Sequence, residues 1–138
     1  MLSSAGPGGL RGIRVLVVED DWLLALELRR LLASQGCTVI GPARIAAQAL
    51  ALIANERPNA PILDVNLDGQ SAGPVAVALA APVVVVSGYN RLRLREPALL
   101  RAPYLNKPVD HRALVSMLAR LVHRIDREPN EAPHSDQS

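Results

Sequence analysis

Carboxylates, a hydroxyl group and a lysine follow the short apolar runs of this sequence. They are Glu19, Asp20 and Asp21 after IRVLVV, Asp64 at the end of PILD, Ser87 at the end of PVVVVS, and Lys107 after YLN. Clustered carboxylates raise each other's pKa unless a cation joins them, and hard oxygen ligands of this kind suit Mg²⁺. A carboxylate beside such an ion can attack a phosphoryl group, while an ammonium and a hydroxyl neutralise the charge. Brought together, these residues would suit phosphoryl transfer.

Each of these residues also has an ordinary structural explanation. An aspartate after a strand is often the N-cap of the next helix, which would account for Asp20 or Asp21. Asp64 alone could be a turn former, and Ser87 or Lys107 alone could be a solvated loop residue. Their common position after strands favours a shared site, because ligands bind at the carboxyl ends of parallel strands.

The elements that must position these residues alternate between strand and helix. Residues 13–18 (IRVLVV) are typical of a strand buried on both faces. Residues 22–34 place leucines at helical spacing, and Gly36 ends that helix. The alternation continues with strands predicted over 37–41, 60–64, 82–87 and 103–106, and helices over 43–55, 74–80 and 110–124. Such units predict an α/β fold, a parallel sheet covered by helices on both faces.

The segment 91–101, RLRLREPALLR, fits this alternation less well. Its arginines and leucines alternate as in a strand, and Pro97 would interrupt a helix, so we expect a short, irregular fourth helix. Its basic residues form what we name the Arg face: Arg91, Arg93, Arg95 and Arg101. The Arg face could bind a partner, although a solvated basic surface is the simpler explanation.

Length and composition indicate one self-sufficient domain. The chain has 138 residues, enough for a core without disulfides or a structural metal. The polar, Gly- and Pro-containing ends predict loose tails over 1–10 and 126–138, leaving a folded domain over 11–125. One cysteine, Cys37, excludes an internal disulfide framework.

Charge and hydropathy bound the environment and partners. The net charge is only +2, so nothing in the bulk charge calls for DNA binding. No apolar stretch approaches the roughly 20 residues needed to cross a bilayer, and the N-terminus lacks a signal-peptide core. We therefore expect a cytoplasmic protein without a membrane partner.

The motifs VVEDD, LDVNL, VVVVSGY and YLNKP occur in this order and resemble those of response regulator receiver domains. The resemblance covers residues 12–125. It implies a flavodoxin-like (βα)5 three-layer sandwich whose five-stranded parallel sheet has the order 2-1-3-4-5. The sequence also resembles a subgroup of stand-alone receivers common in alphaproteobacteria. Val-Val-Ser here replaces the Phe-Ala-Thr of that subgroup's Phe-Ala-Thr-Gly-x-Tyr motif.

The resemblance implies a phosphorylation site around Mg²⁺. Asp64 in LDVNL matches the phospho-accepting aspartate. Glu19 and Asp20 match the acidic pair that helps to hold Mg²⁺, and Asn66 matches the position whose backbone carbonyl completes the metal site.

The resemblance also implies a switch beside that site. Ser87 matches the hydroxyl residue that turns toward the phosphoryl group, and Lys107 the lysine that pairs with it, followed by a cis peptide to Pro108. Tyr104 matches the aromatic residue whose rotamer couples to that hydroxyl and which lies on the partner face. A core aromatic with its hydroxyl at the surface explains Tyr104 equally well.

The resemblance implies a signalling module phosphorylated by a histidine kinase or a histidine phosphotransfer protein. It would bind an output protein, relay the phosphoryl group or drain it, without being an enzyme beyond self-catalysed transfer and slow autodephosphorylation. One alternative is a phosphatase or phosphotransferase using an aspartyl intermediate. Another is a phosphorylation-independent module that binds through the Arg face. The kinase, the output partner and any homodimerisation stay open.

Overall fold

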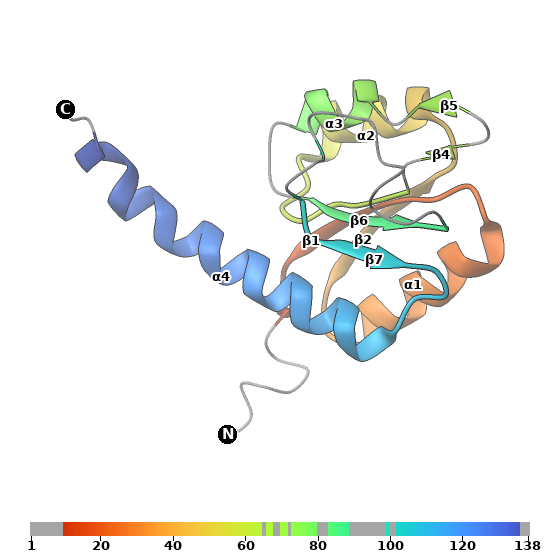
Figure 1. Ribbon diagram of the computed structural model, residues 1–138, viewed down its shortest axis with the longest axis horizontal. Helices are drawn as coiled ribbons and strands as arrows, with labels where there is room; N and C mark the ends of the chain where they lie inside the picture. Colours follow the sequence, from red (N-terminus) through yellow and green to blue (C-terminus); the bar gives the residue numbers. More distant parts are fainter. Residues whose placement is uncertain are drawn as a thin grey trace.

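A five-stranded parallel sheet forms the centre of the computed structural model, which describes residues 10–64, 66–67, 70–71, 73–79, 83–88, 99 and 102–135. Its strands are β1 (Arg14–Val18), β2 (Thr38–Ala43), β3 (Ile62–Asp64), β6 (Val84–Ser87) and β7 (Tyr104–Asn106). Their order across the sheet is β2-β1-β3-β6-β7 (Figure 1). Counted along the chain, this is the predicted order 2-1-3-4-5.

Helices cover both faces of the sheet (Figure 1). They are α1 (Trp22–Ser34), α2 (Ala46–Glu56), α3 (Gly73–Leu79) and α4 (His111–Ser135). Helices α1 and α4 pack on one face, while α2 and α3 pack on the other. The three-layer α/β prediction is therefore confirmed.

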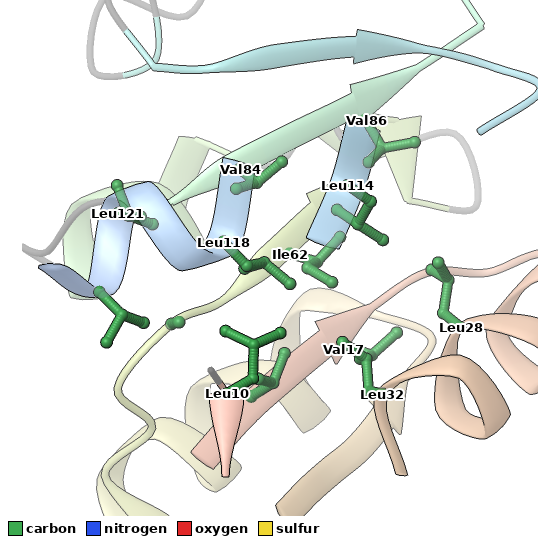
Figure 2. Close-up of a cluster of buried hydrophobic side chains, with 13 residues drawn as sticks. Leu10, Val17, Leu28, Leu32, Ile62, Val84, Val86, Leu114, Leu118 and Leu121 are labelled. Carbon is green, nitrogen blue, oxygen red and sulfur yellow. The ribbon is translucent and has the colours of Figure 1, made fainter. Parts of the chain in front are cut away.

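The two faces of the sheet carry separate aliphatic cores. Successive side chains of a strand point to opposite faces, so Val15 and Val17 pack with α1 and α4, whereas Leu16 and Val18 pack with α2 and α3. Figure 2 shows the core under α1 and α4, in which Leu118 of α4 lies near Ile62 of β3. Burial on both faces explains the continuous apolar runs of the sequence.

The predicted ends of the folded domain need correction. Leu10, expected in the N-terminal tail, is buried in the α1/α4 core. Helix α4 does not end near Arg124 but continues to Ser135, through the segment predicted to be a loose tail, and projects away from the sheet (Figure 1). Packing of its first turns nucleates the helix, so each further residue extends it without a second nucleation cost. Residues 1–9 and 136–138 lie outside the described residues.

A short antiparallel pair follows β3, in a segment where no strand was predicted. Strands β4 (Asn66–Leu67) and β5 (Gln70–Ser71) pair Asn66 with Ser71 and Leu67 with Gln70. The predicted irregular fourth helix, by contrast, falls outside the described residues except for Leu99, and the whole of the Arg face lies outside them. Within the described part of the chain, no helix combines the length and the apolar character needed to cross a bilayer.

Candidate functional site

The carboxyl ends of four strands bring the predicted site residues to one edge of the sheet. Glu19 and Asp20 follow β1, Asp64 ends β3, Ser87 ends β6 and Lys107 follows β7. Parallel pairing keeps these ends in register, and the Lys107 backbone N–H donates to the Ser87 carbonyl at 2.8 Å. Residues far apart in the sequence, from Glu19 to Lys107, therefore lie close together at this edge of the sheet.

Three carboxylates form the centre of this group of residues, and we name them the acidic cluster. Carboxylate oxygens of Glu19, Asp20 and Asp64 lie within 4.8 Å of one another. Glu19 is only 1% exposed and Asp64 only 4%, while Asp20 is partly buried. Charged groups are rarely buried so deeply unless they are paired or bind a metal.

Lys107 joins two of these carboxylates. Its Nζ lies 3.1 Å from Glu19 Oε2 and 3.4 Å from Asp64 Oδ2. Burial of the ammonium opposes its charged form, but the charges of Asp64 and Glu19 outweigh that effect, and the pKa of Lys107 is raised. Lys107 is therefore protonated and positively charged at neutral pH.

Glu19 is held at an unusually high pKa. Burial of its carboxyl is the main cause, the neighbouring Asp64 adds to it, and the pKa rises to about 7. Two contacts oppose this rise: the Asp21 backbone N–H donates to Glu19 Oε2 at 3.0 Å, and Lys107 lies nearby. The Glu19 carboxyl thus resists ionisation even with the Lys107 ammonium beside it.

This donor set fits Mg²⁺. When all three carboxyl groups are ionised, they exceed one ammonium by two charges, which a divalent cation would balance, and all the candidate ligand atoms are hard oxygens. The fit rests on the chemistry and closeness of these groups.

Two neighbouring aspartates have different tasks. Asp21 Oδ1 accepts from the backbone N–H groups of Leu23 (3.1 Å) and Leu24 (3.3 Å), which makes Asp21 the N-cap of α1. Asp20 instead faces the acidic cluster. The ordinary capping explanation therefore holds for Asp21, and Asp20 has a different role.

The remaining predicted residues lie around this centre. Ser87 is buried at the end of β6, and the Lys107–Pro108 peptide is cis as predicted. Tyr104 in β7 is half-buried and packs against the α2/α3 core, so its proposed switching stays a prediction. Asn66 lies in β4, two positions after Asp64, and the metal-binding role of its carbonyl also stays a prediction.

One contact was not anticipated from the sequence. Lys107 was assigned only to the phosphoryl group, whereas in the structure it forms ion pairs with Glu19 and Asp64. The available signal was the shared sheet edge, which brings strand ends together without indicating which side chains pair.

Comparison with known proteins adds sequence evidence. Residues 15–119 match the family described as the response regulator receiver domain. The response regulator MprA of Mycobacterium sp. is 34% identical over 131 residues, which cover 89% of this chain and 55% of MprA. The phyllosphere-induced regulator PhyR of Methylorubrum extorquens is 31% identical over 113 residues, covering 74% of this chain and 42% of PhyR.

A solved structure agrees with the fold. The response regulator PhyR from Brucella abortus has a TM-score of 0.76 at 23% identity, over 98% of this chain and 57% of that protein. The sequence similarity to PhyR supports the alphaproteobacterial subgroup predicted from the motifs, and the structural similarity shows the fold. The chain spans about half the length of the curated relatives it matches.

Proposed function

The chain belongs to the response regulator receiver family, and from this membership we propose that Asp64 accepts a phosphoryl group from a phosphohistidine of a sensor kinase or a phosphotransfer protein. The observation that carries the proposal is the convergence of Glu19, Asp20, Asp64 and Lys107 at one sheet edge. The protein would act in the cytoplasm as one component of a two-component pathway.

The transfer is a displacement at phosphorus. A carboxylate oxygen of Asp64 forms the new O–P bond while the N–P bond of the donor breaks, and the electron pair of that bond returns to the imidazole. Lys107 Nζ, already within 3.4 Å of Asp64 Oδ2, would neutralise a phosphoryl oxygen. The Ser87 hydroxyl would donate to another.

The acidic cluster would hold Mg²⁺ for this step. Glu19, Asp20 and Asp64, together with the Asn66 carbonyl, are the proposed ligands. When bound, the ion supplies positive charge against the phosphoryl oxygens and the acidic cluster. The protein contributes the fixed positions of the carboxylates and the ammonium.

Phosphorylation by a small donor tests this proposal. Incubation with acetyl phosphate and Mg²⁺ should add the mass of one phosphoryl group, which hydroxylamine removes as expected for an acyl phosphate. Asp64→Asn should abolish the addition. Asp21→Asn is the matched control, since asparagine preserves the N-cap and the acceptor is untouched. Equal phosphorylation of wild type and Asp64→Asn would refute the assignment of Asp64.

We propose further that the protein transfers phosphoryl groups only to and from itself. Its output would be a protein–protein contact that changes on phosphorylation, a relay step or a phosphate sink. Turnover of p-nitrophenyl phosphate much faster than loss of phosphate from Asp64 would instead identify an enzyme with a separate substrate.

A further inference from the structure

A surface hollow beside α1 is a second candidate site within the described part of the chain. It has a volume of about 190 Å³. The first turns of α1 and the end of β2 with the turn that follows it form its walls, and its lining residues are Glu19, Trp22, Ala25, Leu26, Arg29, Pro42 and Arg44. The acidic cluster and this hollow share Glu19 alone, so the hollow is a neighbouring site.

Trp22 makes this hollow unusual. It is the single tryptophan of the chain, yet it is 70% exposed, in a protein whose cores consist of aliphatic side chains. Isolated exposed apolar residues are common, but here the exposed indole borders a concave surface. Tryptophan and arginine are the residues most enriched among those that dominate protein interfaces.

Two arginines border the same hollow from different elements. Arg29 lies on α1, Arg44 lies between β2 and α2, and both are exposed. Among the described residues, the ion pairs join Arg14 to Glu56, and Lys107 to Glu19 and Asp64. Neither Arg29 nor Arg44 has an acidic partner among the described residues. Both guanidinium groups can therefore pair with an acidic group of another molecule.

The wall that carries Arg44 is structurally fixed. The Arg44 backbone N–H donates to Gln48 Oε1 at 2.8 Å. Gly41 has φ of +93°, and a Cβ at that position would lie 2.8 Å from the Ala43 nitrogen, so the chain path there requires glycine. A preformed wall lowers the cost of ordering on binding.

We propose that this hollow binds an acidic segment of a partner protein. One apolar side chain of the segment would enter the hollow against Trp22, Ala25 and Leu26, and flanking carboxylates would pair with Arg29 and Arg44. Glu19, which also lines the hollow, is 1% exposed and paired with Lys107, so the two exposed arginines present the charge that selects an acidic occupant. The C-terminal part of α4 does not supply that occupant within the same molecule, because α4 projects away from the sheet on the side opposite the first turn of α1 (Figure 1).

Trp22 itself reports on the proposed contact. Two synthetic helical peptides would share a leucine at the centre of the apolar face, one carrying glutamates beside it and the other lysines. Titrated into the Asp64→Asn protein, the glutamate peptide should shift Trp22 emission to the blue and saturate, and the lysine peptide should not. Because this protein lacks the phospho-acceptor, the outcome is independent of phosphoryl transfer.

Charge reversal on α1 supplies the matched control. Arg29→Glu should weaken the glutamate peptide about fivefold, as expected for the loss of one well-placed surface ion pair. Arg30→Glu changes the same charge on the next position of the same helix, outside the hollow, and should leave affinity unchanged. Circular dichroism would confirm that both variants fold.

Three results would overturn the proposal. The lysine peptide could bind as well as the glutamate peptide, or the two reversals could weaken binding equally. Sedimentation could also show that the protein dimerises at the concentrations used and that Arg29→Glu abolishes the dimer, in which case a second copy occupies the hollow.

Discussion

Replacement of Lys107 by methionine should destabilise the protein far more than loss of a surface ion pair. Lys107 is 26% exposed, and its carboxylate partners Glu19 and Asp64 are almost fully buried. Removing one partner of a buried pair typically costs 3–5 kcal/mol, and the partial exposure of Lys107 lowers our expectation to about 2 kcal/mol. Urea unfolding without Mg²⁺ should therefore show the midpoint falling by about 1 M.

Arg14→Met is the matched control for this variant. It breaks the Arg14–Glu56 ion pair, whose side chains are 38% and 49% exposed. Exposed pairs contribute at most about 1 kcal/mol, so the midpoint should fall by at most half as much. Equal losses for the two variants would refute the view that the buried carboxylates depend on the lysine.

Mg²⁺ should partly replace the missing ammonium. Without Lys107 the three carboxylates still repel one another, and more of their negative charge is left for a divalent cation to neutralise. Saturating Mg²⁺ should stabilise Lys107→Met more than wild type in the same urea assay, by at least about 1 kcal/mol, which is the interaction of two unit charges about 4 Å apart in bulk water. An equal gain in both proteins would mean that cation and lysine do not share the same carboxylates.

Three further predictions concern the scaffold. Asp21→Ala removes both N-cap hydrogen bonds of α1 and should cost about 1 kcal/mol in thermal unfolding, whereas a change below experimental error would contradict the capping role. Leu118→Ala removes a fully buried side chain from the α1/α4 core and should lower the free energy of unfolding by about 3 kcal/mol. Leu23→Ala, at an exposed position, should change it by almost nothing. Similar losses in the two variants would contradict the assigned core. Burial raises the pKa of the Cys37 thiol, which lowers the fraction of reactive thiolate. At pH 8, iodoacetamide should therefore alkylate Cys37 more slowly than it alkylates the thiol of free glutathione, as followed by mass spectrometry. Equal rates would show an accessible thiolate.

The layered fold was predictable because the local signals agreed with the tertiary arrangement. Apolar runs marked strands buried on both faces, and helix α1 was predicted with its observed bounds, Trp22–Ser34. Asp21 caps the start of α1, and Gly36, with φ of +88°, follows its end. The closeness of the site residues followed from topology, since parallel strands end at one edge.

Other features depended on information that residue patterns do not carry. The length of α4 depends on helix propagation from a packed segment, while its prolines indicated a tail. The β4–β5 pairing is a contact between two-residue strands, too short to show an alternating pattern. The ion pairs of Lys107 depend on side-chain directions, which spacing along the chain does not specify.

The division of each strand between two cores also limits how the sequence can change in evolution. Substitution of one aliphatic residue by another alters only one core. Deletion of one residue from β3 would turn the remaining side chains of that strand to the opposite face of the sheet. Residues would then exchange between the two cores, and the carboxylate of Asp64 would be displaced. Descendants of this gene should therefore tolerate many replacements within the strands, while insertions and deletions accumulate in the connections between strands and helices.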